Sequence, residues 1–292
     1  ARPRPRALAF IALTKPRIIE LLLVTTVPTM IVAEGGVPSL WLMVATVVGG
    51  TLAAGGANAI NMYVDRDIDA LMERTRNRPL VTGELTPSEA RWFALGIEIV
   101  SFVWLWGFVN LLSAVLAVSA TLFYVFVYTL WLKRSSTNNI VIGGAAGAVP
   151  VLVGWAAVTN SLAWEPVILF AVIFFWTPPH FWALAIRYRD DYQAAEVPML
   201  PAVTTLRVTA RKIVVYTLIT VALTLLFGVV ASMGWVYWLA AVVSGGVFTA
   251  LAVQVQRRPE PALAMRLFGW SITYLTVLFG AMAVDVLVRN GI

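Results

Sequence analysis

The sequence has no cysteine, a single histidine and few charged residues for its length. Without cysteine there can be no disulfide, no zinc–thiolate site and no thiol catalysis. The lone histidine, His180, excludes a multi-histidine metal site within one chain. Charged residues make up 12% of the 292 positions and hydrophobic residues 60%, whereas a soluble domain usually carries about 25% charged residues. This composition predicts an integral membrane protein.

The apolar residues gather in nine runs, each long enough to cross a bilayer at roughly 20 residues per helix. The sequence therefore predicts an all-α, polytopic membrane protein with nine transmembrane helices in one domain. The predicted spans are residues 16–36, 39–62, 90–109, 112–131, 138–158, 165–186, 212–232, 235–255 and 266–288. Two connecting loops, residues 64–88 and 188–211, are longer than a turn requires, and we expect them to be functional.

The basic residues predict the orientation of the chain. All but one of the 21 Lys and Arg residues lie at the N-terminus or in the loops that follow every second span. Such an asymmetry marks the cytoplasmic face, so the N-terminus is expected inside and the C-terminus outside. The exception, Arg289, lies four residues after Asp285 and is expected to pair with it. This distribution accounts for the net charge of +6 without a nucleic-acid partner.

Two local patterns predict details of the helices. Thr86-Pro87-Ser88-Glu89 has the form of a capping box with proline at the first helical position, so a helix should begin there. Glycine clusters at residues 49–50, 55–56 and 143–147 lie inside predicted spans. They lack the Gly-Lys-Ser/Thr continuation of a phosphate-binding loop, and we expect them to allow close packing between helices.

Polar residues crowd the end of the second span. Asn61, Asp65 and Asp69 are four residues apart, so a helix would place them on one face and Asp67 on the opposite side. Several arginines follow within residues 66–78. A row of carboxylates at a membrane boundary is costly unless it holds something positive. We therefore interpret these residues as a binding site.

The ends of the fourth and sixth spans bring further polar residues to the same side of the membrane. Lys133 and Arg134 end the fourth span, and the pair Asp190-Asp191 follows the sixth. The spacing of His180, Arg187 and Asp191 predicts a single helical stripe.

Two aspartate clusters beside many basic residues are typical of a site for Mg²⁺ and a polyphosphate. Mg²⁺ prefers oxygen ligands and keeps positions open for substrate phosphates, and nearby cations can neutralise a departing diphosphate. In the alternative, the basic residues only anchor the chain at the membrane surface, and the aspartates pair with neighbouring arginines. His180 also has a structural alternative, as a hydrogen-bonded packing residue among aromatic side chains.

The polar segment resembles the first aspartate-rich motif of the UbiA superfamily of intramembrane prenyltransferases, and the similarity is greatest to the branch that modifies haem. The matching pattern is Asn61-x-x-x-Asp65-x-x-x-Asp69 followed by Arg74-Thr75-x-Asn77-Arg78-Pro79. Further matching stretches begin at Leu13, Tyr128, Asn139, Trp176 and Asp191, whereas the last third matches only as generic spans. Where many relatives have a spaced second Asp-x-x-x-Asp motif, this chain has Arg187-Tyr-Arg-Asp190-Asp191-Tyr192.

The resemblance implies a bundle around a central cavity, capped by the cytosolic loops 64–88 and 188–211. It implies Mg²⁺-dependent transfer of a farnesyl group from farnesyl diphosphate to a vinyl group of haem b, with addition of water, giving haem O. The expected location is the bacterial plasma (inner) membrane, with the active site on the cytoplasmic side. A haem A synthase or oxidase assembly partner cannot be inferred from the residues.

The resemblance also implies roles for individual residues. Asn61, Asp65 and Asp69 are expected to hold Mg²⁺, with Asp190 or Asp191 closing the site from the opposite side. The residues expected to bind substrates are Arg74, Arg78, Lys133, Arg134, Lys15, Arg17, Asn77, Arg187 and Tyr192. Phe181, Trp182 and Tyr192 are expected to shield the allylic cation. His180 is expected to orient the haem or to handle the proton of the added water.

Two other functions fit part of the pattern. One is a different UbiA-type prenyltransferase, which would act on an aromatic acid or a quinone precursor. The other is an ion-coupled transporter with intramembrane carboxylates. Against transport, the carboxylates cluster at one face of the membrane, whereas transport sites lie near the midplane.

Overall fold

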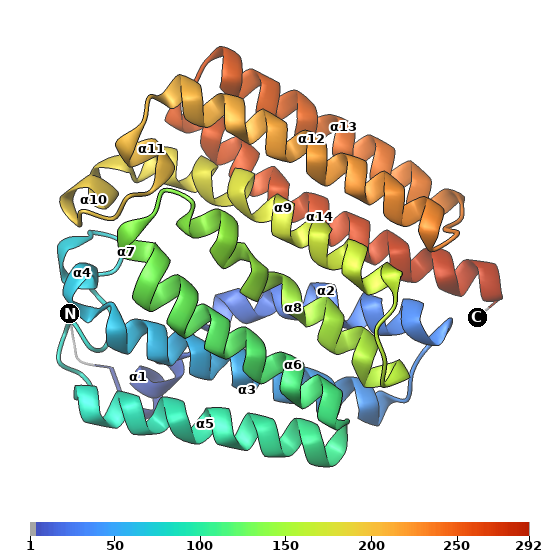
Figure 1. Cartoon of the computed structure of the whole chain (residues 1–292), viewed down its shortest axis with the longest axis horizontal. Helices are drawn as coiled ribbons and strands as arrows, with labels where there is room; N and C mark the ends of the chain where they lie inside the picture. Colours follow the sequence, from blue (N-terminus) through green and yellow to red (C-terminus); the bar gives the residue numbers. More distant parts are fainter. Residues whose placement is uncertain (1–3, 292) are drawn as a thin grey trace.

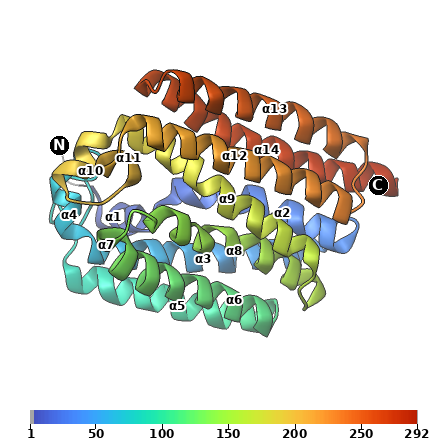
Figure 2. The ribbon, with the colours of Figure 1, turned by 45° about the horizontal axis from the view of Figure 1, so that its top comes forward.

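The protein is a bundle of long helices that run side by side (Figures 1 and 2). A computed structural model describes the chain from residue 4 to residue 291, with side chains throughout except at residues 17–23. Arg17, one of the expected substrate-binding cations, therefore lies outside the described side chains. The two ends of the chain lie at opposite ends of the bundle (Figure 1).

Eight of the described helices are long and apolar enough to cross a membrane. They are α3 (Leu40–Val64), α5 (Pro87–Phe108), the continuous helix Leu111–Ser135, α8 (Asn139–Thr159), α9 (Trp164–Arg187), α12 (Leu206–Val230), α13 (Trp235–Arg257) and α14 (Pro261–Asn290). The expected first span coincides with α2 (Pro16–Glu34), whose described apolar part is Val24–Glu34. The all-α, polytopic class is confirmed, and nine spans remain a prediction.

Four short helices gather at the end of the bundle that holds the N-terminus (Figure 1). They are α1 (Arg6–Leu13), α4 (Arg66–Leu71), α10 (Arg189–Ala194) and α11 (Leu200–Val203). The two long loops predicted from the sequence are thus partly helical. The second is also shorter than predicted, because α12 begins at Leu206, where the Thr205 side chain accepts a hydrogen bond from the Val208 amide.

Local sequence patterns explain where helices begin and how closely they approach. The predicted capping box is confirmed, since Thr86 and Glu89 exchange side-chain to backbone hydrogen bonds at the start of α5. The packing role of glycine is confirmed at Gly143 of α8, which lies directly against the ring of Tyr128. A side chain at this position would collide with that ring.

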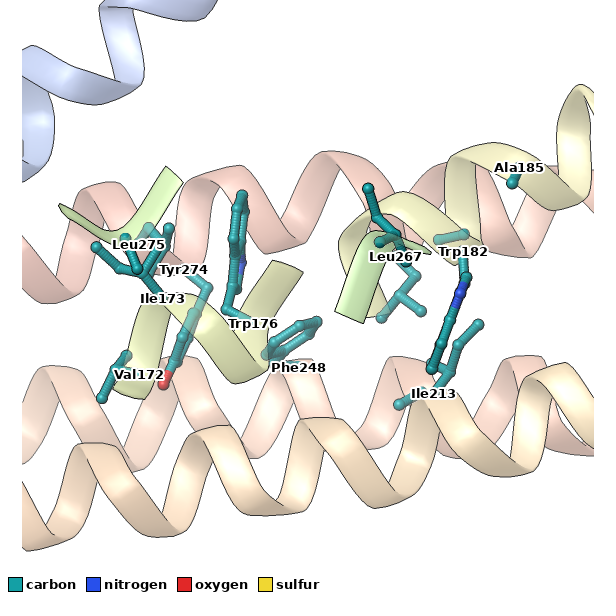
Figure 3. Packing of buried hydrophobic residues seen from close by; sticks show 14 of the residues in the cluster. Val172, Ile173, Trp176, Trp182, Ala185, Ile213, Phe248, Leu267, Tyr274 and Leu275 are labelled. Atoms are coloured by element: carbon teal, nitrogen blue, oxygen red, sulfur yellow. The ribbon is translucent and has the colours of Figure 1, made fainter. Parts of the chain in front are cut away.

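The largest buried cluster joins α9, α12, α13 and α14. Figure 3 shows Trp176 of α9 beside Phe248 of α13, and Trp182 of α9 pointing toward Ile213 of α12. The predicted ion pair is confirmed, with Arg289 Nε 3.5 Å from Asp285 Oδ2. The last third of the chain therefore forms the packed support against which α9 is held.

Candidate active site

Asn61, Asp65 and Asp69 form one buried polar face where α3 ends and α4 begins. Asp65 occupies the junction between α3 and α4, and the helical bonding pattern continues across it: the Asp65 amide donates to the Asn61 carbonyl at 2.9 Å and the Asp69 amide to the Asp65 carbonyl at 2.8 Å. The Asn61 amide nitrogen donates to Asp65 Oδ2 at 2.7 Å. The three side chains are at most 3% exposed. The predicted shared face is confirmed.

Each of the three side chains on this face is contacted by a basic side chain from a different segment of the chain. Lys15, between α1 and α2, donates to Asn61 Oδ1 at 2.8 Å. Lys133, at the end of the fourth predicted span, pairs with Asp65 Oδ2, and Arg78, in the loop after α4, pairs with Asp69 Oδ2. Three segments far apart in the sequence therefore converge on a face of three residues. We call these six residues the polar clamp.

Asp65 has one carboxylate oxygen that accepts no hydrogen bond from the described residues. Its Oδ1 is buried and has no hydrogen-bond partner among the described residues, and Arg134 Nη2 lies 3.7 Å away, at ion-pair distance. A buried carboxylate oxygen without a partner is costly. Mg²⁺ prefers such hard oxygen atoms, so the donor set fits this ion.

Asp67 points away from the polar clamp, as its position on the helix predicts. Its carboxylate accepts two hydrogen bonds of 2.7 Å from Arg134. These bonds, with a smaller contribution from the charge of Arg134, lower the pKa of Asp67 to about 2 against the opposing effect of burial. Arg134 is thus held mainly on the outer side, beside a hollow of 430 Å³ that Val64 and Thr129 also line.

A π-helical segment positions the inner part of the fourth predicted span. Between α6 (Leu111–Leu122) and α7 (Lys133–Ser135), η1 (Phe123–Leu132) has the wider π-helical winding. Thr129, which is fully buried, accepts a hydrogen bond of 3.1 Å from Asn61. Such segments are rare and are often found at functional sites. The sequence interpretation missed Thr129, because a change in helical winding leaves no clear periodic signal.

Lys15 has an unusual backbone conformation for a residue with a side chain. Its φ of 51° lies in the left-handed region, directly before Pro16 at the start of α2. A non-glycine residue in this region carries a conformational cost and is worth attention at a functional site. Burial, together with the charges of Arg78 and Lys133, lowers the pKa of Lys15 well below its usual range. The clamp thus places cations close together.

A backbone hydrogen bond links the second acidic cluster to the loop that follows α4. The amide of Arg74 donates to Asp191 Oδ2 at 3.4 Å, whereas Asp190 is exposed. The predicted stripe from His180 to Asp191 is wrong, because α9 ends at Arg187 and α10 begins at Arg189. Among the described residues, no three His, Cys, Asp or Glu side chains converge in the way of a preformed metal site.

The other expected substrate-binding residues occupy varied positions. Arg74 and Asn77 are exposed in the loop after α4, where the Asn77 carbonyl accepts a hydrogen bond from Arg4. Arg187 is exposed and lines a separate hollow of 510 Å³ with residues that begin α14. Tyr192 is buried in the core. Among the described residues, no hydrogen bond or ion pair joins these side chains to the polar clamp.

The expected aromatic shield is only partly compatible with the structure. Trp182 is 1% exposed and meets the ring of Tyr216 on α12 edge-on, at a centroid distance of 5.2 Å. This contact explains why Trp182 acts as a core residue between α9 and α12. Phe181 is partly exposed and lies edge-on to His180, with centroids 5.1 Å apart.

His180 is held in a stack of rings near α14. Its ring lies between Trp176 and Phe268, with centroid distances of 4.3 and 4.4 Å and nearly parallel planes. Its Nδ1 is 2.7 Å from the hydroxyl of Ser271. The structural alternative for His180, a hydrogen-bonded residue among aromatic side chains, therefore describes its surroundings well. Ser271 was not predicted, because it lies in the part of the chain that matched only as generic spans.

Comparisons with known proteins place the fold in a single family. A model of the UbiA prenyltransferase family matches residues 22–281. Among curated proteins, the chain is 54% identical over 97% of its length to a Streptomyces coelicolor protein named protoheme IX farnesyltransferase, covering 92% of that protein. It is 57% identical over 97% of its length to a Frankia casuarinae protein of the same name, covering 99% of it.

Solved structures agree in fold. The chain superposes on a digeranylgeranylglyceryl phosphate synthase with a TM-score of 0.79 at 16% identity, covering 96% of this chain and 98% of that one. It also superposes on a UbiA homologue from Archaeoglobus fulgidus, solved with DMAPP and Mg²⁺ bound, with a TM-score of 0.62 at 16% identity, covering 94% and 99%. At these identities the likeness concerns the fold alone.

Proposed function

This chain belongs to the UbiA prenyltransferase family, and we propose that it transfers a farnesyl group from farnesyl diphosphate to a vinyl group of haem b, with addition of water, to give haem O. It is a membrane-embedded prenyltransferase. The choice of substrates rests on one observation. The chain is more than 50% identical, over nearly its full length, to proteins named protoheme IX farnesyltransferase. Because the family consists of prenyltransferases, an ion-coupled transporter is no longer a reason for the membrane-boundary carboxylates.

The polar clamp is the proposed site of the diphosphate. Asn61, Asp65 and Asp69 would hold Mg²⁺, which when bound supplies positive charge to the diphosphate, and Asp191 is placed better than Asp190 to approach from the second loop. Lys133 and Arg78 now pair with the two clamp carboxylates, and Lys15 donates to the neutral amide oxygen of Asn61. We propose that these three cations turn to the phosphate oxygens when substrate binds, because two phosphates would bring more negative charge than the carboxylates.

The reaction follows from the chemistry of an allylic diphosphate. The bond between C1 of the farnesyl chain and the diphosphate oxygen breaks, and diphosphate leaves with both electrons. The clamp cations stabilise the charge that develops on the leaving group. The haem vinyl group then supplies the electron pair for a new carbon–carbon bond, and water adds to the resulting cation and loses a proton. Asp65 and Asp69 hold the site in place but form no covalent bond.

We propose that the reaction takes place at the cytoplasmic surface of the bacterial plasma membrane. Helix α4, which contains Asp69, and helix α7, which begins at Lys133, lie at the end of the bundle that carries the N-terminus (Figure 2). The distribution of basic residues favours the cytoplasm for that end. A farnesyl chain and a porphyrin are both apolar, so a site at the boundary lets the diphosphate remain near water. The apolar parts can then enter the bundle.

The proposed function is tested by offering the protein two different acceptors for the farnesyl group. Membranes containing the protein would be incubated with labelled farnesyl diphosphate and Mg²⁺, together with either haem b or hydroxybenzoate. We expect label to appear in haem and not in hydroxybenzoate. Label in hydroxybenzoate alone would instead establish a prenyltransferase for an aromatic acid.

A further inference from the structure

The hydroxyl of Ser271 decides which nitrogen of His180 carries the proton. Ser271 Oγ lies 2.6 Å from the Phe268 carbonyl oxygen and 2.7 Å from His180 Nδ1. A carbonyl oxygen can only accept, so the single hydroxyl proton of Ser271 is committed to Phe268. The contact with His180 then requires that Nδ1 carries a proton and donates it to Ser271 Oγ.

The environment holds the imidazole ring in this arrangement. Trp176 and Phe268 cover its two faces, and the indole nitrogen of Trp176 donates to the Ser271 carbonyl at 2.8 Å. Ser271 is therefore the shared acceptor of two aromatic residues on α9. Rotation of the ring would break the hydrogen bond and disturb both stacking contacts.

The other ring nitrogen is left without a hydrogen-bond partner among the described residues. In a neutral imidazole with a proton on Nδ1, Nε2 carries a lone pair. It can then coordinate a metal ion or accept a proton, and it cannot donate to a carboxylate. For haem, this favours contact with the iron over a hydrogen bond to a propionate.

We infer that Ser271 is a positioning residue that keeps the neutral His180 in the tautomer with its lone pair on Nε2, ready to coordinate the iron of bound haem. The assignment of the haem rests on the proposed function, whereas the tautomer does not. Partners of this kind fix the ring and the tautomer of metal-binding histidines, and losing one typically lowers metal affinity by about 10–100-fold.

The sequence has one histidine. In a protein labelled with ¹⁵N-histidine, the imidazole signals in the NMR spectrum therefore belong to His180 and need no assignment. Without haem, we expect Nδ1 to be protonated and Nε2 to be bare in the wild type and in Ser271→Thr, which retains the hydroxyl. Ser271→Ala should lose this preference. An Nε2-protonated or doubly protonated ring in the wild type would overturn the proposal, even if every variant failed to fold.

Ser244 provides a matched control. It is a buried serine of α13 whose hydroxyl donates to the Ala240 carbonyl and whose own carbonyl accepts from the indole of Trp270. It lacks the contact with a histidine that Ser271 makes. Ser244→Ala should therefore leave the ¹⁵N spectrum of His180 unchanged, and an equal effect of the two alanine variants would contradict a specific role of Ser271.

A titration with haem b tests the second half of the proposal. The absorption spectrum of the bound haem should show imidazole ligation in the wild type and lose it in His180→Ala, and Ser271→Ala should bind haem about 10–100-fold more weakly. Identical haem spectra in the wild type and His180→Ala would refute iron coordination. This titration needs no farnesyl diphosphate, so it is separate from the test of transfer activity.

Discussion

Asp65 combines complete burial with an incompletely satisfied carboxylate. One oxygen accepts from Asn61 and pairs with Lys133, and the other has no hydrogen bond among the described residues. Asp65→Asn keeps the shape of the side chain but removes its charge. We expect farnesyl transfer per molecule of folded protein to fall by about 100-fold or more, with the amount of folded protein in the membrane measured alongside.

Asp67 gives the control for this substitution within the same motif. Its side chain is 60% exposed and pairs with Arg134 outside the polar clamp. Asp67→Asn should reduce transfer by less than about tenfold, because an exposed ion pair contributes about 1 kcal/mol or less. Equal losses in the two variants, measured as kcat/KM for farnesyl diphosphate, would show that the inner face has no special role.

Lys133 allows the same face to be tested through stability. Its ammonium group pairs with the fully buried Asp65, and its side chain is 16% exposed. Lys133→Met removes the hydrogen-bonded cation of a buried carboxylate and leaves only the longer ion pair with Arg134, and it should lower the free energy of unfolding by about 3–5 kcal/mol. The double variant Asp65→Asn/Lys133→Met should regain most of that stability but no activity. Thermal unfolding in detergent micelles measures the stability of both variants. If the double variant were no more stable than Lys133→Met, a direct pairing of Asp65 with Lys133 would be contradicted.

The spacing of Asn61, Asp65 and Asp69 predicts their shared face, because helical periodicity fixes which side chains are neighbours. The partners of these residues are less predictable. Lys133 and Lys15 could be chosen as cations by their charge and by the family resemblance, but no sequence rule pairs one with Asp65 and the other with Asn61. Thr129 and Ser271 carry no charge and occur among many similar residues in apolar spans, so their roles emerge only from tertiary packing.

At the scale of elements, η1 is the feature that the sequence conceals. The predicted span 112–131 gives the correct location, yet the same residues change from α-helical to π-helical winding at Phe123. The stripe expected from His180 to Asp191 fails for a related reason. Helical periodicity holds only while the helix continues, and the break at Tyr188 redirects the chain before Asp191 is reached.

The contact between η1 and α8 can be tested with a pair of glycines. Gly143 lies against the Tyr128 ring, whereas Gly147, one turn later in α8, has no neighbour within 4 Å among the described residues. Gly143→Ala should lower the free energy of unfolding by about 1–3 kcal/mol through overpacking, and it should reduce activity by moving η1. Gly147→Ala should do neither, and thermal unfolding with an activity assay on both variants distinguishes them.

At the scale of the whole molecule, hydropathy predicted the class of the protein well, because each span must satisfy its own backbone hydrogen bonds in lipid. Boundaries were less accurate where charged residues remain helical, as at the start of α12. The distribution of basic residues gives an orientation that a structure without a membrane does not determine.

The absence of cysteine makes that orientation directly testable. A single cysteine replacing exposed Arg258, between α13 and α14, should be protected from a membrane-impermeant thiol reagent in intact cells. A single cysteine replacing exposed Ser161, between α8 and α9, should react. Both should react after the membrane is permeabilised, and the reverse pattern in intact cells would invert the topology.

The most direct test of the account is the mass of the haem formed by the purified protein. Wild-type protein and Asp65→Asn would be supplied with haem b, farnesyl diphosphate and Mg²⁺, and the extracted haem would be analysed by mass spectrometry. We predict that the wild type converts haem b to a product heavier by one farnesyl group plus a hydroxyl and that Asp65→Asn leaves haem b unchanged. No product from the wild type, or equal product from both proteins, would contradict the account.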